Sequence, residues 1–304
     1  MIAWLGKSAS MHPELARLYA EKYHLNDPLP VQFYYYVLNL FQGNLGFSPS
    51  RGFQPVAEVI SLTLPLTLQI AFFAFIISVA LGILLGVLSA QHQHGKADTC
   101  IRAFYLAGYS SPPFFIALIL LIVFAFKVNW LPTGGAVDVS LNAPTTITGL
   151  PMVDAAIEGN VQYLLSSLKH VILPSVALAL VTFGVLTRVL RSSLLDVMHA
   201  NYVRTARAKG LDENAVFFKH ALRNAMISVV TISSLMITWL ITGTIFVENI
   251  FAYPGMGQYL VTALAAEDYP GILAVTIVFA IIIVITNLIA DILYAVVDPQ
   301  VRLG

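Results

Sequence analysis

The chain has 304 residues, of which 58% are apolar and only 11% are charged, and its formal net charge is zero. A soluble domain usually has about 25% charged residues, so this composition excludes an ordinary water-soluble protein. Its apolar runs far exceed the roughly 10 residues of a barrel strand, which excludes a membrane β-barrel and predicts an all-α integral membrane protein.

The first 58 residues are polar to amphipathic and contain five prolines. We predict that residues 1–58 form an extracytoplasmic or interfacial segment and that residues 59–304 form a transmembrane domain. A helix is expected over 12–23, and the aromatic-rich stretch 32–41 is typical of a helix at the membrane interface.

Five apolar stretches in the second region are long enough to be membrane spans. Their predicted apolar ranges are 60–90, 103–126, 171–187, 224–247 and 271–290. In the first of them, Gly82 and Gly86 form a small-xxx-small pair, which either lets another helix approach closely or is simply tolerated there. Pro112 and Pro113 lie inside the second.

The positive charges of the chain gather in two of the loops between these spans. Loops 91–102 and 188–224 carry basic residues, whereas segments 127–167 and 248–270 have none after Lys127. The positive-inside rule therefore places the first two loops, and the C-terminus, in the cytoplasm.

The 188–224 loop is the longest charged amphipathic segment of the chain, and we call it the coupling segment. We predict two helices in it, separated by a corner. Gly210 can end the first helix in a left-handed conformation, with Leu211 closing the apolar side of the cap. Asp212 is a suitable N-cap for the second helix, with Glu213 near its positive dipole end.

The text YVRTARAKGL followed by HALRN in this loop resembles the cytoplasmic coupling motif of ATP-binding-cassette importer permeases. The general motif is Glu-Ala-Ala, three residues, Gly, nine residues, then Ile-x-Leu-Pro. Ala206, Gly210 and Leu222 keep its identities, and the departures resemble the dipeptide/oligopeptide branch. Ordinary membrane anchoring is the alternative explanation for the charges. The resemblance implies contact with an ATPase through Arg204, Thr205, Ala206, Arg207, Lys209, Gly210, Leu211, His220 and Leu222.

Other stretches extend the resemblance over most of the chain. NDPLPVQF at 26–33 and GNLGFS at 43–48 are similar to the family's first extracytoplasmic segment, and NLIADILYAVVDPQVR at 287–302 is similar to its ending. VENIFAYPGMGQYLV at 247–261 is similar to its outer loop. The acidic residues there either only solvate that loop or help to dock an extracytoplasmic solute-binding protein. The resemblance favours docking, for which the candidates are Glu248, Tyr253, Pro254, Gly255, Gly257 and Asp268.

The resemblance implies a helical bundle of the type I importer permease kind, with about five transmembrane helices here and usually six in the family. The family's first helix and the Pro-Gly-Asp-Pro text after it are absent from this sequence. Either the start codon is assigned too late or the helix has been lost. We expect the former, because five spans would export the N-terminus without an obvious signal.

No phosphate-binding GxxxxGK[ST] loop and no nucleophile–base set are evident, so we expect no catalytic residues and no cofactor on this chain. The resemblance implies a permease subunit for di- or oligopeptides in a prokaryotic plasma membrane. Its expected partners are membrane lipid, a second permease subunit in a heterodimer, two ATP-binding subunits that hold ATP and Mg, and a solute-binding protein, with no nucleic acid.

Three alternatives remain open on sequence grounds. The same machinery could carry oligosaccharides or nickel. An ion-gradient-driven secondary transporter would show several charged residues deep in its spans, which are missing here. An intramembrane enzyme would show a Ser/His/Asp or HExxH arrangement, which is also missing.

Asp291 lies at the edge of the last span with Asn287 on the same face, which favours a polar contact between helices over a proton relay. His92 and His94 lack the further ligands of a metal site, and Cys100 is the only cysteine, so we predict no metal.

Overall fold

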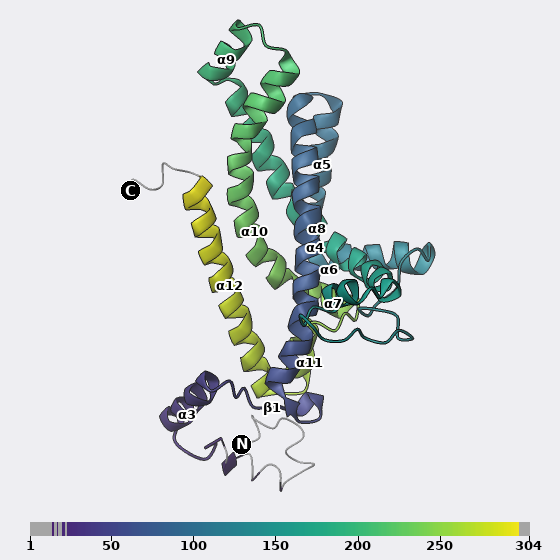
Figure 1. Cartoon of the computed structure of the whole chain (residues 1–304), viewed down its shortest axis with the longest axis vertical. Helices are drawn as coiled ribbons and strands as arrows, with labels where there is room; N and C mark the ends of the chain where they lie inside the picture. Colours follow the sequence, from purple (N-terminus) through teal and green to yellow (C-terminus); the bar gives the residue numbers. More distant parts are fainter. Residues whose placement is uncertain (1–13, 15–16, 18–19, 22, 298–304) are drawn as a thin grey trace.

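The computed structural model describes Glu14, Arg17, Ala20, Glu21 and residues 23–297. Long helices run side by side along the longest axis of the molecule, with α9 at one end and β1 towards the other (Figure 1). The predicted 12–23 helix and the tail 298–304 lie largely or wholly outside the described residues.

The helix predicted over 32–41 is confirmed as α3, Leu29–Phe41, which has no buried residue, and its place at the membrane interface stays a prediction. A small antiparallel pair follows, β1 (Phe47–Ser48) and β2 (Gln54–Pro55), with the 3-10 turn Pro49–Arg51 between the two strands. This hairpin leads directly into the first long helix.

The helix α4, Val56–Gln91, packs along α8, Val161–Met198. A Cβ atom added to Gly82 would lie 2.6 Å from the Cβ of Leu186, and one added to Gly86 would lie 3.1 Å from the Cβ of Leu190. Of the two explanations left open for this glycine pair, close approach of another helix is therefore the one observed. Both leucines are fully buried at this contact.

The span predicted over 103–126 is a bent pair of helices. The helix α5, Lys96–Ser110, and the stretch comprising α6, Pro113–Leu120, and the π-helical turn Leu121–Lys127 meet at 108°. The cause is the double proline, because a proline ring disfavours the helical conformation of the residue before it. Ser111, which precedes Pro112, is accordingly extended (φ −92°, ψ 137°). The α6 helix consequently leaves the long bundle sideways (Figure 1).

After the outer helix α7, Pro151–Glu158, the Asn160 side chain caps α8 by accepting the Tyr163 amide at 3.1 Å. At 38 residues, α8 extends well beyond the predicted apolar range 171–187 in both directions. Its later turns carry the charged residues of the coupling segment up to Met198. Part of that segment is thus a direct extension of a span.

The coupling segment continues through α9, Asn201–Ala208, and the π-helical turn η4, Ala215–Leu222, into α10, Arg223–Ile250. The last helices are α11, Met256–Ala265, and α12, Tyr269–Val297. By length and composition, the described part of the chain has 4 helices able to cross a membrane, or up to 5 spans if the bent pair counts as one. This agrees with the five predicted spans.

Buried apolar side chains form two main clusters. One lies among α4, α8 and α10 and includes Ile70, Leu186 and Leu240. The other joins the first turns of α4 to α11 and α12 through Val56, Met256 and other residues. Polar contacts at the two ends of the bundle supplement these clusters.

Candidate coupling site and buried carboxylates at both ends

The helix α9 lies beyond the spans at one end of the molecule (Figure 1). It buries Val203 and Ala206, which pack with Val216 in a small apolar cluster. The rest of α9 is exposed. This amphipathic pattern holds the helix against η4 and leaves its polar face accessible.

The predicted corner at Gly210 is confirmed. Gly210 has a φ of +74°, and the Leu211 amide donates to the Ala206 carbonyl at 3.4 Å, as in a left-handed helix cap. The Asp212 carboxylate accepts the Asn214 amide at 3.0 Å, which confirms its capping role. The expected apolar closure by Leu211 is not seen, since that side chain is 43% exposed.

Two contacts across the corner fix α9 relative to α10. Arg207 Nε donates to Glu213 Oε1 at 2.8 Å, and Asn224 Nδ2 donates to the Tyr202 hydroxyl at 2.9 Å. The predicted coupling residues thus occupy one ordered unit, and their contact with an ATPase stays a prediction. Ala206 is buried, His220 and Leu222 are half-buried, and the exposed ones are Arg204, Thr205, Arg207, Lys209, Gly210 and Leu211.

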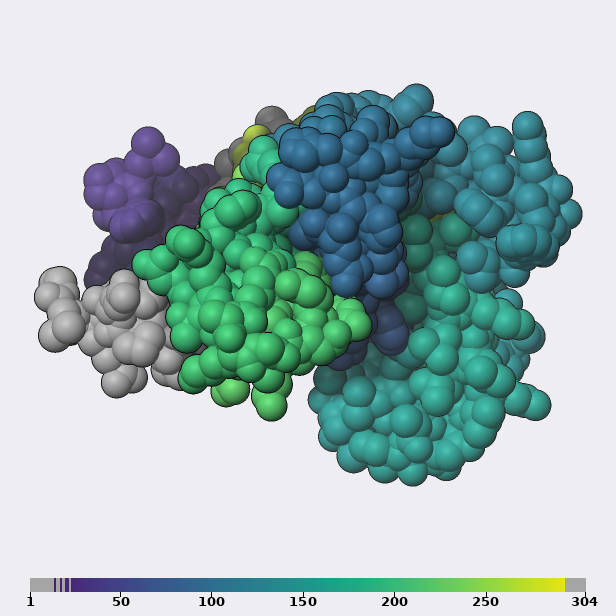
Figure 2. Space-filling model, turned by 90° about the horizontal axis from the view of Figure 1, so that it is seen from above, coloured from purple at the N-terminus to yellow at the C-terminus, as the bar shows by residue number. Residues whose placement is uncertain are grey.

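A cavity of about 570 Å³ separates the coupling segment from the turn between α4 and α5. Its lining includes His92 and Gln93 on the turn and His199, Arg207 and Asn214 on the coupling segment. Figure 2, which views the molecule from this end, shows the two regions next to each other.

Beneath the turn, one carboxylate joins three helices. Asp98, at the start of α5, is fully buried and receives Nε and Nη2 of Arg191 from α8, both at 2.8 Å. The Ser89 hydroxyl of α4 donates to it at 2.5 Å, and the His94 amide donates at 3.2 Å. Paired charges and additional donors are what a buried carboxylate requires.

A second buried carboxylate, Glu248, lies near the opposite end of the molecule. It accepts a hydrogen bond from the Thr67 hydroxyl of α4 at 2.7 Å and another from the Gln258 amide of α11 at 3.0 Å. The same Thr67 oxygen accepts the Met256 amide at 2.8 Å. A Cβ atom on Gly255 would lie 2.4 Å from the Glu248 carboxyl carbon, so glycine permits this close approach.

Two more contacts fasten the same outer loop. Gln69 Nε2 donates to the Tyr253 hydroxyl at 3.0 Å and to Ser167 Oγ at 3.1 Å, which ties the loop to α4 and α8. Burial, with the nearby Glu248 carboxylate, raises the pKa of Tyr253 above its usual range, so the phenol stays a neutral donor or acceptor.

A third carboxylate, Asp268, joins the first hairpin to the start of α12. It accepts hydrogen bonds from the Ser48 hydroxyl, from the Ser50 hydroxyl at 2.7 Å and from the Gly271 amide at 2.9 Å. The N-terminal hairpin is therefore anchored to an element more than two hundred residues further along the chain.

These positions bear on the residues proposed for docking a solute-binding protein. Glu248, Tyr253, Gly255, Gly257 and Asp268 are buried, and only Pro254 is half-exposed. Five of the six residues are therefore part of the interior of the outer loop and not of its surface. Docking at this loop stays a prediction, and it would use the surface that these residues support.

The outer segment between α6 and α8 has its own organising carboxylate. Asp154 is buried and accepts the hydroxyl and the amide of Thr148 at 2.5 and 2.7 Å and the amide of Gly149 at 3.2 Å. The Thr148 hydroxyl holds the pKa of Asp154 below its ordinary value, despite the opposing effect of burial.

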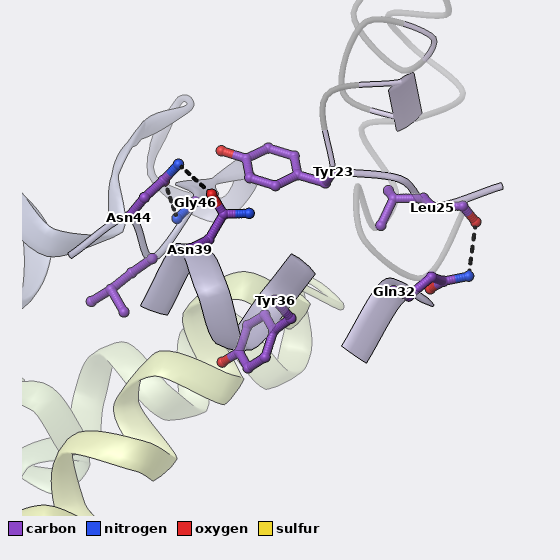
Figure 3. Close-up of a pocket in the computed structure, with 8 residues that line it drawn as sticks. Tyr23, Leu25, Gln32, Tyr36, Asn39, Asn44 and Gly46 are labelled. Atoms are coloured by element: carbon purple, nitrogen blue, oxygen red, sulfur yellow. Dashed lines mark hydrogen bonds between the residues drawn. The ribbon is translucent and has the colours of Figure 1, made fainter. Parts of the chain in front are cut away.

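A pocket in the N-terminal segment, lined by Tyr23, Gln32, Tyr36, Asn39 and other residues, measures about 10 Å³ (Figure 3). That volume is close to the minimum for one water molecule, so it is too small for a transported solute. No group of three or more metal-ligating side chains occurs in the part of the chain that the structure describes.

Reasoning from the sequence singled out Asp291, named Glu248 and Asp268 as docking candidates, and missed the buried carboxylates Asp98 and Asp154. Asp291 is exposed, and the predicted contact between helices is made by Asn287, which accepts the Thr238 hydroxyl at 3.1 Å. One available signal for Asp98 was that it is the only acidic residue of the otherwise basic 91–102 loop.

Comparison with known proteins identifies the family. The model described as "Binding-protein-dependent transport system inner membrane component" matches residues 82–303. The oligopeptide transport system permease protein AppB of Bacillus subtilis (strain 168) is 41% identical over 284 residues, covering 93% of this chain and 84% of that protein. The probable D,D-dipeptide transport system permease protein DdpB of Escherichia coli (strain K12) is 38% identical over 280 residues, covering 92% and 82%.

Solved structures share the fold at low sequence identity. The MetNI methionine ABC transporter in an inward-facing conformation matches with a TM-score of 0.54 and 15% identity, over 77% of this chain and 91% of that one. An amino acid ABC transporter matches with a TM-score of 0.55 and 10% identity, over 78% and 93%. With the helical architecture and the sequence relatives in agreement, the chain belongs to the family of binding-protein-dependent transport system inner membrane components, the permeases of ABC importers.

Proposed function

We propose that this chain is the multi-pass permease subunit of an ATP-driven importer that takes up di- or oligopeptides. The observation that carries the proposal is 41% identity to an oligopeptide permease over 93% of the chain. The exposed polar face of α9, beyond the spans, supports a contact with a separate ATPase. The chain itself binds no ATP and performs no catalysis in this proposal.

The proposed assembly contains a second permease, two ATP-binding subunits and an extracytoplasmic solute-binding protein. The coupling segment and the C-terminus face the cytoplasm, which the distribution of basic residues supports. ATP-driven closure of the ATPases moves α9. Because α9 is joined to α8 and α10, the attached spans rotate as rigid bodies and change access to the pathway.

The test is expression of this chain with its neighbouring genes, followed by purification and uptake of labelled di- and oligopeptides into proteoliposomes. ATPase subunits should copurify, and peptide uptake should require ATP and the solute-binding protein. Uptake driven by an ion gradient without ATP would contradict the proposal, and ATP-dependent uptake of nickel or an oligosaccharide alone would change the cargo.

Gly210 provides a matched test of the coupling role. Valine there is strained at a φ of +74° although nothing lies within 4 Å of its Cβ, and Gly43, at the other end, has the same φ and the same open space. We expect Gly210→Val to abolish uptake without preventing membrane insertion, while Gly43→Val retains uptake. Equal uptake by both variants would remove the coupling assignment.

A further inference from the structure

The ion pair between Asp98 and Arg191 links the coupling segment to α4 and α5, two helices that lie outside that segment. Arg191 is on α8, about two helical turns before that helix ends at Met198. Asp98 begins α5, and Ser89 on α4 donates to the same carboxylate. At this end of the bundle, one buried carboxylate thus adds a polar link to the packing of α8 against α4 and α5.

The geometry of the pair suits the transmission of movement. Two parallel N–H donors of Arg191 meet the two carboxylate oxygens of Asp98, both at 2.8 Å, so the relative orientation is fixed as well as the distance. Asp98 is fully buried and the Arg191 side chain is only 18% exposed. Breaking this pair would leave a buried charge without its partner.

The three helices also touch closely on the side of the ion pair that faces away from the α4–α5 turn. Gly82 and Gly86 bring α4 against α8, and a Cβ atom on Gly108 of α5 would lie 2.3 Å from the Leu180 carbonyl oxygen of α8. The cavity of about 570 Å³ meanwhile separates the α4–α5 turn from the coupling segment. Across this gap, hydrogen bonds connect the turn to α8 through Asp98, which accepts from the His94 amide of the turn and from Arg191 of α8.

We propose that Asp98 and Arg191 are positioning residues for transport: they make α4, α5 and α8 one body, so that the ATPase stroke received by α9 moves three helices together. This inference rests on the proposed function. It assigns the pair to the coupling of hydrolysis to transport, not to cargo binding or to ATP hydrolysis itself.

The test uses the complete transporter in proteoliposomes and compares Asp98→Asn with Arg102→Gln. Asparagine keeps the shape of the side chain and removes its charge, whereas Arg102 is an exposed neighbour 3.8 Å from the carboxylate. For Asp98→Asn we expect ATP hydrolysis close to the wild-type rate and about tenfold less peptide taken up per ATP. For Arg102→Gln we expect the wild-type ratio.

A distance measurement separates coupling from simple stability. Spin labels on Cys100 of α5 and on a His199→Cys variant at the end of α8 occupy two exposed positions on either side of the pair. In the otherwise wild-type complex, the distance between the labels should be the same with and without ATP. In Asp98→Asn it should change when ATP binds.

Each opposite result has a defined meaning. An unchanged ratio of uptake to hydrolysis in Asp98→Asn overturns the proposal, as does a parallel loss of both activities together with the assembled complex. So does a label distance that changes with ATP in the wild-type background. If the complex without the Asp98→Asn change hydrolyses ATP but imports no peptide, the proposed cargo is wrong. The label distances would still test the ion pair in that case.

Discussion

Asp98 and Glu248 are both fully buried carboxylates that join helices distant in sequence, yet they are satisfied in different ways. Asp98 meets the guanidinium of Arg191 in a two-pronged ion pair. Glu248 accepts hydrogen bonds from uncharged groups, the Thr67 hydroxyl and the Gln258 amide.

The difference concerns how easily each contact opens. Separating a buried ion pair leaves two charges without compensation, whereas separating a carboxylate from neutral donors forfeits hydrogen bonds of about 1.5–3 kcal/mol each before water replaces them. The α4–α5–α8 contact is therefore suited to staying closed. The contact of α4 with the outer loop has no opposing charge to separate, and we expect it to open at a lower cost.

The strongest test of this comparison is Arg191→Met, which keeps much of the apolar stem and leaves Asp98 buried without its partner. We expect a loss of about 3 kcal/mol in stability, at the lower end for broken buried pairs because Arg191 keeps some contact with water. Thermal unfolding in detergent would measure it. Arg188→Met, at an exposed site on the same helix, should change stability by less than about 0.5 kcal/mol. Equal losses in the two variants would show that the Asp98–Arg191 pair does not stabilise the fold more than an exposed arginine does.

At the other end, Glu248→Ala removes the acceptor for the Thr67 hydroxyl and the Gln258 amide. We expect a loss of about 2 kcal/mol, since those donors become buried without partners. The outer loop should also become more sensitive to protease in membrane vesicles. Glu267→Ala, on an exposed residue of the same loop, serves as the control. If the loop stays resistant in Glu248→Ala, Glu248 does not fasten it.

The glycine contacts sharpen the comparison within the α4–α8 interface. Gly82→Ala places a Cβ 2.6 Å from that of Leu186, and Gly86→Ala places one 3.1 Å from that of Leu190. We expect overpacking to cost about 1–2 kcal/mol at Gly82 and less at Gly86. Thermal unfolding of the two variants gives the order. The reverse order would mean that the helices separate more easily at Gly82.

The sequence supported the spans, the Gly210 corner and the family because each depends on local information: an apolar run, a glycine with a capping aspartate, a continuous motif. It did not predict the bend after Ser111, although Pro112 and Pro113 were visible. Prolines occur in straight and in bent membrane helices alike, and the neighbouring helices decide between them.

The partners of Asp98 and Glu248 could not be predicted for a different reason. Ser89 and His94 are near Asp98 in sequence, but Arg191 is on another span, and nothing local distinguishes it from the other basic residues of the coupling segment. Glu248 was predicted to help dock a solute-binding protein, which would place its side chain at the surface of an outer loop. Its burial depends on Gly255 and Gly257, whose missing side chains admit the carboxylate.

The smallest effect on stability is expected at the exposed ion pair of the coupling segment, Arg207 with Glu213. Their side chains are 38% and 67% exposed, so solvent screens the pair and Glu213→Gln should cost less than about 0.5 kcal/mol. Arg207→Gln should be equally mild for unfolding, but it also removes a positive charge from the face proposed to meet the ATPase. Reduced ATPase copurification in Arg207→Gln alone would assign Arg207 to that contact. If both variants retain the ATPase subunits equally, Arg207 serves only its ion pair with Glu213 within this chain. The buried pair of Asp98 and Arg191 would then contribute more to coupling than the exposed pair does.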